Sequence, residues 1–220
     1  MVNRTLIEAT WVEVFLTRLN ELPLDSGLGT NGACLIASFS IEGHAIVSVD
    51  DMIADASGAM PPALRHPADW VRFQAALDEA ALVVLGRRSH ETTPNPKGRN
   101  RLVMSRSVAG LEQRVDGWWW NPEGVLLQDA LDAAAPEGGL VAVPGGRGVF
   151  DFFLGAGFDA FHLARNAGVM LPGGVPVFGA CADGLSAEAV LSGHGLRAGA
   201  AEVLDADAGV TLTVWRRGRR

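Results

Sequence analysis

Three short apolar runs, each ending in a polar or glycine-rich turn, constrain the fold of this chain more than any other feature. Residues 82–85 stop at Gly86, residues 102–104 stop at Ser105, and residues 140–143 stop just before the pair Gly145-Gly146. Such runs, separated by segments with helical spacing, are typical of parallel strands that are buried on both faces. The sequence therefore predicts an α/β fold with a mostly parallel central sheet flanked by helices.

Other segments complete this outline. Apolar residues at helical spacing predict helices at 5–20, from Pro67 onward, at 122–135 and at 148–154, and further strands are expected at 44–49, 160–163 and 210–215. Trp118-Trp119-Trp120 is expected to alternate between core and solvent in a strand. Residues 1–40 are interpreted as an N-terminal extension with an amphipathic helix, and residues 41–220 as one domain.

Charge and composition exclude several classes of function. The net charge of −7 disfavours nucleic-acid binding, and the basic end of the chain is interpreted as a solvated tail. No apolar run is long enough to span a membrane, so a cytoplasmic protein with a small-molecule substrate is expected. The two cysteines and five histidines show no metal-ligand spacing, so no metal site is predicted. A homodimer is one option that the sequence leaves open.

The turns after the apolar runs suit a phosphate group. A glycine-rich turn between a strand and a helix lets backbone N–H groups approach an anion, and Gly145-Gly146-Arg147-Gly148 is placed in this way. Arginine pairs well with phosphate, and Arg87, Arg88 and Arg106 follow the two other runs. An ordinary turn and solubilising surface arginines are the alternative interpretations.

Asp69 is the carboxylate whose position in the sequence points most clearly to a role in catalysis or ligand binding. It falls in the first turn of the helix that starts at Pro67, and Phe73, four residues later, shares its face. Together with Met60, such apolar neighbours would raise the pKa of the carboxylate and let it hold a protonated heterocycle. The alternative is an acid that only stabilises the helix N-terminus.

Four segments, in this order, resemble the dihydrofolate reductase superfamily. They are Met60-Pro-Pro followed by Pro67-Ala-Asp69 and Phe73; Gly86-Arg87-Arg88-Ser89-His-Glu91; Gly98-Arg99 followed by Leu102-Val-Met-Ser105-Arg106; and Gly145-Gly146-Arg147-Gly148-Val149-Phe150. The resemblance covers about residues 44–178. It implies the dihydrofolate reductase fold, NADPH as cofactor, and hydride transfer to a C=N bond of a pteridine-like ring.

The resemblance also implies roles for individual residues. Asp69 would be catalytic and bind the amidine edge of the ring, Phe73 and Met60 would line the substrate, and Arg99 would pair with a substrate carboxylate. The cofactor would be bound by Gly86, Arg87, Arg88, Ser89, Ser105, Arg106, Gly145, Gly146, Arg147, Gly148 and Val149.

Some positions depart from the dihydrofolate reductase pattern. Pro62 stands where a tryptophan is usual, Pro144 precedes the Gly-Gly pair, and Ala164 falls near an expected threonine. Ser48-Val-Asp50-Asp51-Met-Ile-Ala and Pro172-Gly173-Gly174-Val-Pro-Val-Phe178 are instead similar to the reductase domain of riboflavin biosynthesis, which implies a stand-alone reductase of a ribosylamino-pyrimidine. A protein that binds NADPH without turnover is a third hypothesis.

Overall fold

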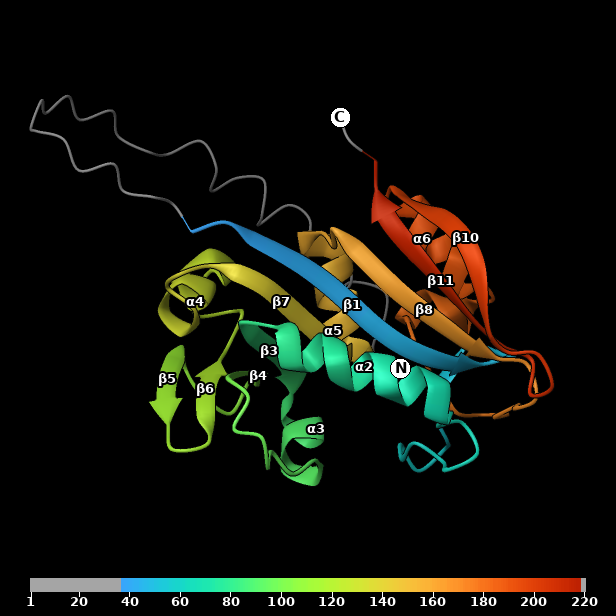
Figure 1. Ribbon diagram of the computed structural model, residues 1–220. Coiled ribbons are helices and arrows are strands. Elements are labelled where there is room, and N and C mark those ends of the chain that lie inside the picture. Colours follow the sequence, from blue (N-terminus) through green and yellow to red (C-terminus); the bar gives the residue numbers. More distant parts are fainter. Residues whose placement is uncertain (1–36, 219–220) are drawn as a thin grey trace, which may run out of the picture. The chain divides into compact units, whose positions relative to one another are not determined.

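The computed structural model describes residues 37–218, and its strands form one sheet of nine and one of two (Figure 1). The larger sheet has the order β10-β11-β8-β1-β7-β3-β4-β6-β5, and β2 pairs with β9. The strands are β1 Phe39–Ser48, β2 Met52–Ala54, β3 Leu82–Gly86, β4 Arg101–Met104, β5 Leu111–Arg114, β6 Gly117–Trp120, β7 Gly139–Gly145, β8 Ala160–Asn166, β9 Val175–Pro176, β10 Leu196–Asp205 and β11 Val210–Arg217.

Helices lie in half of the connections between these strands. They are α2 Pro67–Glu79, α3 Arg87–Thr92, α4 Leu127–Ala134, α5 Arg147–Ala156, α6 Ala187–Gly193 and the 3-10 helix η2 Gly179–Asp183. Within residues 37–218, no helix combines the length and apolar character that crossing a bilayer requires. The predicted helix at 5–20 lies outside the described residues, and β1 begins at Phe39, just before the predicted start of the domain at residue 41.

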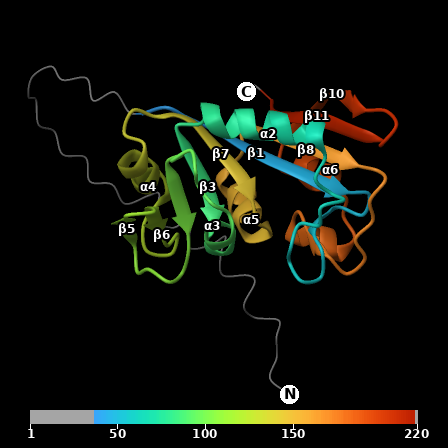
Figure 2. The ribbon, with the colours of Figure 1, turned by 60° about the horizontal axis from the view of Figure 1, so that its bottom comes forward.

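The centre of the sheet is parallel and its two edges are antiparallel, as Figure 2 lets the reader follow. β1 pairs in parallel with β7 and β8, and β3 pairs in parallel with β7 and β4. The antiparallel pairs β8–β11, β10–β11 and β5–β6 close the ends. The carboxyl ends of the central strands therefore share one edge, which is the edge where ligands bind in open α/β sheets.

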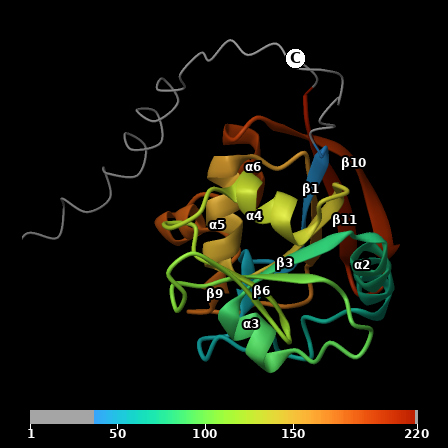
Figure 3. The ribbon, with the colours of Figure 1, turned by 90° about the vertical axis from the view of Figure 1, so that its left-hand side faces the viewer.

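Helices cover both faces of the sheet, so successive strand residues are buried on opposite sides (Figure 3). Val84 belongs to the core cluster that contains the buried residues of α4, α5 and α6, whereas Val83 joins the cluster of Leu77 on α2. Trp120 and Trp119 likewise belong to the core clusters on opposite faces, and both are buried. The predicted alternation of the tryptophans is confirmed. The expectation that one face of this strand meets solvent was wrong, because both faces are covered.

Two further expectations need correction. The helix predicted at 122–135 begins only at Leu127, because the Asn121 side chain accepts from the Glu123 N–H and its carbonyl from the Gly124 and Val125 N–H groups, which forms a turn instead. Pro144 lies inside the central strand β7, where the pairing with β3 shifts register between Val83 and Leu85. A proline lacks the N–H of a regular ladder, and such a shift accommodates it.

Candidate functional site

The Gly145-Gly146 turn forms the junction between β7 and α5. Both glycines have positive φ, 112° and 88°, a region that side-chain-bearing residues rarely adopt. A Cβ on Gly145 would lie 2.7 Å from the Phe150 ring, so the backbone comes close to the first turn of α5. Arg147 is exposed, and a Cβ on Gly148 would meet no atom within 4 Å. An anion can therefore approach the start of this helix.

The turn after β3 lies beside the Gly145-Gly146 turn. A Cβ built on Gly146 would lie 3.9 Å from Ser89 Oγ, and one on Gly86 would lie 3.3 Å from Val149 Cγ2. The fold thus brings together two turns that are about sixty residues apart in the sequence. Val149 itself is buried and its N–H bonds to the Gly146 carbonyl at 2.9 Å, so this residue shapes the turn rather than offering a donor to a ligand.

A hollow of about 370 Å³ lies at the start of α3 and the end of β4, lined by Arg87, Ser105, Arg106 and Ser107, and is called the arginine–serine hollow below. Ser105 is buried, and its hydroxyl lies 2.8 Å from that of Ser107. Two guanidinium groups and two hydroxyls are the donors that a phosphate monoester requires. Three of the four residues were predicted for the cofactor, whereas Ser107 was missed.

Asp69 occupies the first turn of α2 and is half-buried. Within the described residues its carboxylate has no hydrogen-bond or ion-pair partner, and it does not cap its own helix. Burial raises the pKa of Asp69 to about 6, against the opposing charges of His66 and Arg72. A carboxylate with this pKa can bind a cationic ring or exchange a proton near neutral pH.

Apolar side chains predicted to accompany Asp69 differ in their burial. Phe73 packs against the core cluster of Leu77 and lies beside Trp70, with ring centroids 5.5 Å apart and the ring planes tilted by 37°. Met60 and Trp70 are exposed, and the Arg65 guanidinium lies 4.6 Å from the Trp70 ring centre. The arginine–serine hollow is not lined by Asp69, Phe73 or Met60.

Two predicted ligand-binding arginines bond to other parts of the chain. Arg99 donates to Asp78 at 2.6 Å and to the Gln74 side chain at 2.8 Å, both on α2. Arg88 donates to the Ser57 carbonyl at 3.0 Å and so ties α3 to the loop before α2. A substrate carboxylate would have to displace Asp78 from Arg99, and its role in substrate binding stays a prediction.

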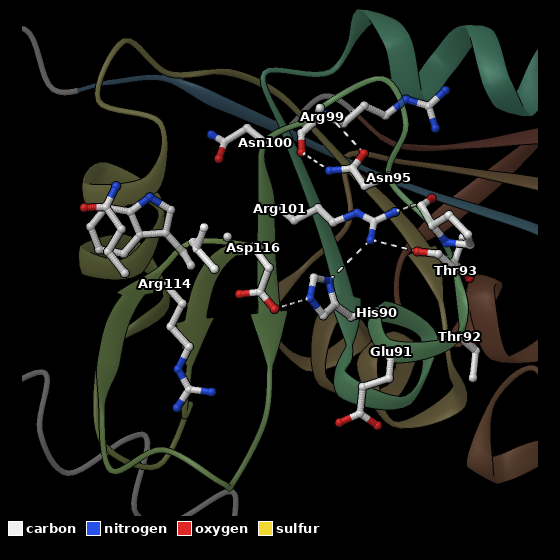
Figure 4. Close-up of a pocket in the computed structure, with 16 residues that line it drawn as sticks. His90, Glu91, Thr92, Thr93, Asn95, Arg99, Asn100, Arg101, Arg114 and Asp116 are labelled. Carbon is white, nitrogen blue, oxygen red and sulfur yellow. Dashed lines mark hydrogen bonds and ion pairs between the residues drawn. The ribbon is translucent and has the colours of Figure 1, made fainter.

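A second, larger hollow of about 670 Å³ lies between the β5–β6 hairpin and the loop before β4, and is called the hairpin groove (Figure 4). Residues 90–95, 98–101 and 113–118 line it. Figure 4 shows His90 between Asp116 and Arg101, with distances of 2.9 and 3.3 Å. Arg101 is buried, and its remaining bonds go to the Thr93 and Pro94 carbonyls. Sequence reasoning missed this network because its members have no motif spacing.

Comparisons of sequence identify no relatives. No protein-family model matches the chain, and no curated protein matches it significantly.

Comparison of structures does identify neighbours. A dihydrofolate reductase from Enterococcus faecalis, complexed with NADP(H) and RAB-propyl, matches with a TM-score of 0.57 at 16% identity and covers 82% of this chain and 97% of its own. A putative riboflavin biosynthesis protein from Shewanella sp. PV-4 matches with a TM-score of 0.55 at 20% identity, over 82% and 100%. A deaminase/5-amino-6-(5-phosphoribosylamino)uracil reductase from Thermotoga maritima matches at 0.54 and 16%, over 82% and 57%.

These neighbours define the class of the fold. Residues 37–218 have the mixed α/β fold of these neighbours, which is the dihydrofolate reductase-like fold that the four sequence motifs predicted. Both branches that the motifs resemble, the dihydrofolate reductases and the riboflavin-pathway reductases, occur among the matches. At identities of 16–20%, the likeness establishes the fold and leaves the activity to the residues of the site.

Proposed function

We propose that this protein is an NADPH-dependent reductase that transfers a hydride to a C=N bond of a nitrogen heterocycle. The observation that carries the proposal is the Asp69 carboxylate, which is half-buried, unpaired within the described residues and raised in pKa. Keeping such a group costs stability, so it is expected where a ligand uses it. The fold supports the proposal, because one structural neighbour is complexed with NADP(H).

The residues present fit the cofactor. NADPH, when bound, would supply the hydride. The arginine–serine hollow would hold the 2′-phosphate, and the Gly145-Gly146 turn with the start of α5 would hold the pyrophosphate. These two sites are joined by the contacts of Ser89 and Val149 described above.

On the substrate side, the chain would supply position and a proton. The Asp69 carboxylate would accept hydrogen bonds from the amidine edge of the ring and favour its protonated form, which makes the C=N carbon a better hydride acceptor. Phe73 would contact one face of the ring. Because the pKa of Asp69 is about 6, the ionised form that binds a cation predominates above that pH.

The pteridine ring is our first choice of substrate, and a ribosylamino-pyrimidine is the second candidate. A specific observation favours the second. The two segments that resemble the riboflavin-pathway reductase lie against each other, since Asp50 accepts from the Leu171 N–H at 3.0 Å and β2 pairs with β9. These contacts hold the fold together and do not touch a substrate, so they support the likeness to the riboflavin-pathway reductases but do not identify the substrate.

The test follows oxidation of NADPH by loss of its absorbance. The full chain is supplied separately with dihydrofolate and with 5-amino-6-ribosylamino-uracil phosphate, and each reaction is repeated with NADH. We expect turnover with one of the two substrates and a preference for NADPH. NADPH binding without reduction of either substrate would favour the binding protein without turnover, and no NADPH binding would refute the proposal.

A further inference from the structure

A cluster of metal-ligating side chains lies on the strands β1 and β8, outside the proposed reductase site. Glu42 and His44 are two residues apart on β1 and therefore point to the same face of the sheet. His162 is the register partner of His44 on β8, and the two imidazole rings stack with centroids 4.5 Å apart. One ligand atom from each of the three residues falls within 4.8 Å of the other two.

One nitrogen of this cluster has no partner. His44 is 5% exposed, and its Nε2 is buried without a hydrogen bond in the described chain. His162 Nε2 lies 2.9 Å from the Glu42 carboxylate, and these two side chains are partly open to solvent. A buried polar atom without a partner destabilises the fold, and a bound ligand would remove that cost.

From this arrangement, we propose that Glu42, His44 and His162 bind a divalent transition-metal ion of the zinc type. Two imidazoles and one carboxylate are a common zinc ligand set, and three protein ligands leave a fourth position for water. Zinc–nitrogen bonds are about 2.1 Å long, so the two stacked rings must tilt toward each other when the ion enters. The partly exposed Glu42 and His162 give the ion its path.

The ligand set favours zinc over a hard cation. Magnesium and calcium rely on several oxygen ligands, whereas imidazole nitrogens suit zinc, nickel and copper. The sequence spacing did not indicate the site, because residues 44 and 162 meet only through strand pairing.

The experiment is a titration of the chelator-treated full chain, freed of any purification tag, with zinc chloride by calorimetry. We expect one ion per chain and a raised melting temperature with zinc. H162Q and E42Q should each weaken binding by more than the roughly 10- to 100-fold that loss of an outer-shell partner costs. H194Q is the matched control, because His194 is exposed at the end of α6 and should leave binding unchanged.

A second readout keeps the test independent of folding. Because His44 is buried, H44Q can disturb the fold. The titration of H44Q is therefore interpreted only if its circular dichroism spectrum matches that of the parent. Cobalt chloride should give visible absorption bands in the parent and lose them in H162Q. Absence of zinc binding, or binding that H162Q and E42Q leave unaltered, would overturn the proposal. Neither readout uses NADPH or substrate, so the result is separate from that for the reductase.

Discussion

At the scale of single residues, Asp69 is the carboxylate whose proposed role in catalysis and effect on stability can be tested together. Its pKa is raised from 3.8 to about 6, so the folded state favours the protonated form. Stability therefore falls as pH rises from about 4 to 6, and the full cost is present above pH 6. The charge is kept at the expense of the fold, which is expected of a residue that acts on a ligand.

The substitution Asp69→Asn should separate the two effects. We expect turnover to fall roughly 100-fold, with little change in NADPH affinity. Because each pKa unit corresponds to about 1.4 kcal/mol and partial exposure reduces the effect, the variant should be about 1–2 kcal/mol more stable at pH 8 and equal to the parent near pH 4. Denaturant unfolding at both pH values is the measurement.

Asp78→Asn is the control on the same helix. Asp78 accepts from Lys97 and Arg99, and these bonds lower its pKa, so its replacement should destabilise rather than stabilise at pH 8. If Asp69→Asn kept full turnover, Asp69 would have no place in the mechanism.

Asp51 has an unfavourable backbone conformation that the hydrogen bonds of its side chain offset. It has φ of 65°, where the riboflavin-pathway motif has glycine, yet its carboxylate accepts from Arg165 at 2.6 Å and from the Ala187 N–H at 3.2 Å. Asp51→Gly should relieve strain of at most about 1 kcal/mol but remove a partly buried ion pair worth more. We expect a net loss of about 1–2 kcal/mol in urea unfolding. A more stable variant would show that backbone strain dominates.

At the scale of elements, the start of α3 and the end of β4 form one phosphate-sized hollow. We expect Arg87→Ala combined with Arg106→Ala to weaken NADPH binding by about 100-fold or more and leave NADH binding nearly unchanged, since each of the two charge-assisted bonds is worth about 1.5–3 kcal/mol. Fluorescence titration with both nucleotides measures this. Arg197→Ala, on β10, is the control, because this exposed arginine is remote in the sheet order from β4. An unaltered NADPH preference would place the 2′-phosphate elsewhere.

At the scale of the whole molecule, the fit of β1 against the aromatic core decides stability. Gly43 on β1 faces the Phe161 ring, and a Cβ there would lie 2.3 Å from Phe161 Cδ2. Phe161 belongs to a group of phenylalanine rings in mutual contact, which includes Phe150, Phe158 and Phe178, so the ring has no free space to move into. Interiors packed in this way resist added volume.

Gly43→Ala should therefore cost about 1–3 kcal/mol in thermal or denaturant unfolding. Gly155→Ala is the matched control, because a Cβ there meets no atom within 4 Å and alanine favours a helix, so this variant should gain up to about 1 kcal/mol. Adding Phe161→Leu to Gly43→Ala should recover part of the loss, and a purely additive double variant would contradict the packing explanation.

Local patterns were enough to predict much of the framework. The strands β3, β4 and β7, which contain the apolar runs 82–85, 102–104 and 140–143, and the helix that starts at Pro67 were correctly predicted, because apolar spacing and proline placement act over a few residues. The glycine-rich turn after β7 was also predicted, and Gly145 and Gly146 have positive φ. The strand β10 and the shortened α4 were missed, since their bounds depend on neighbours that are distant in the sequence.

The sequence by itself determined where the central strands form, where the helix at Pro67 begins and that Gly145 and Gly146 make a tight turn, because those properties follow from steric and hydrogen-bonding preferences of adjacent residues. Only the tertiary structure decided which side chains meet. It placed Arg87 and Ser107 around the same hollow and bonded Arg99 to Asp78. It also made His44 and His162 register partners on neighbouring strands. Strand order and register fix these encounters, and both are set by the packing of the whole sheet rather than by any local stretch of chain.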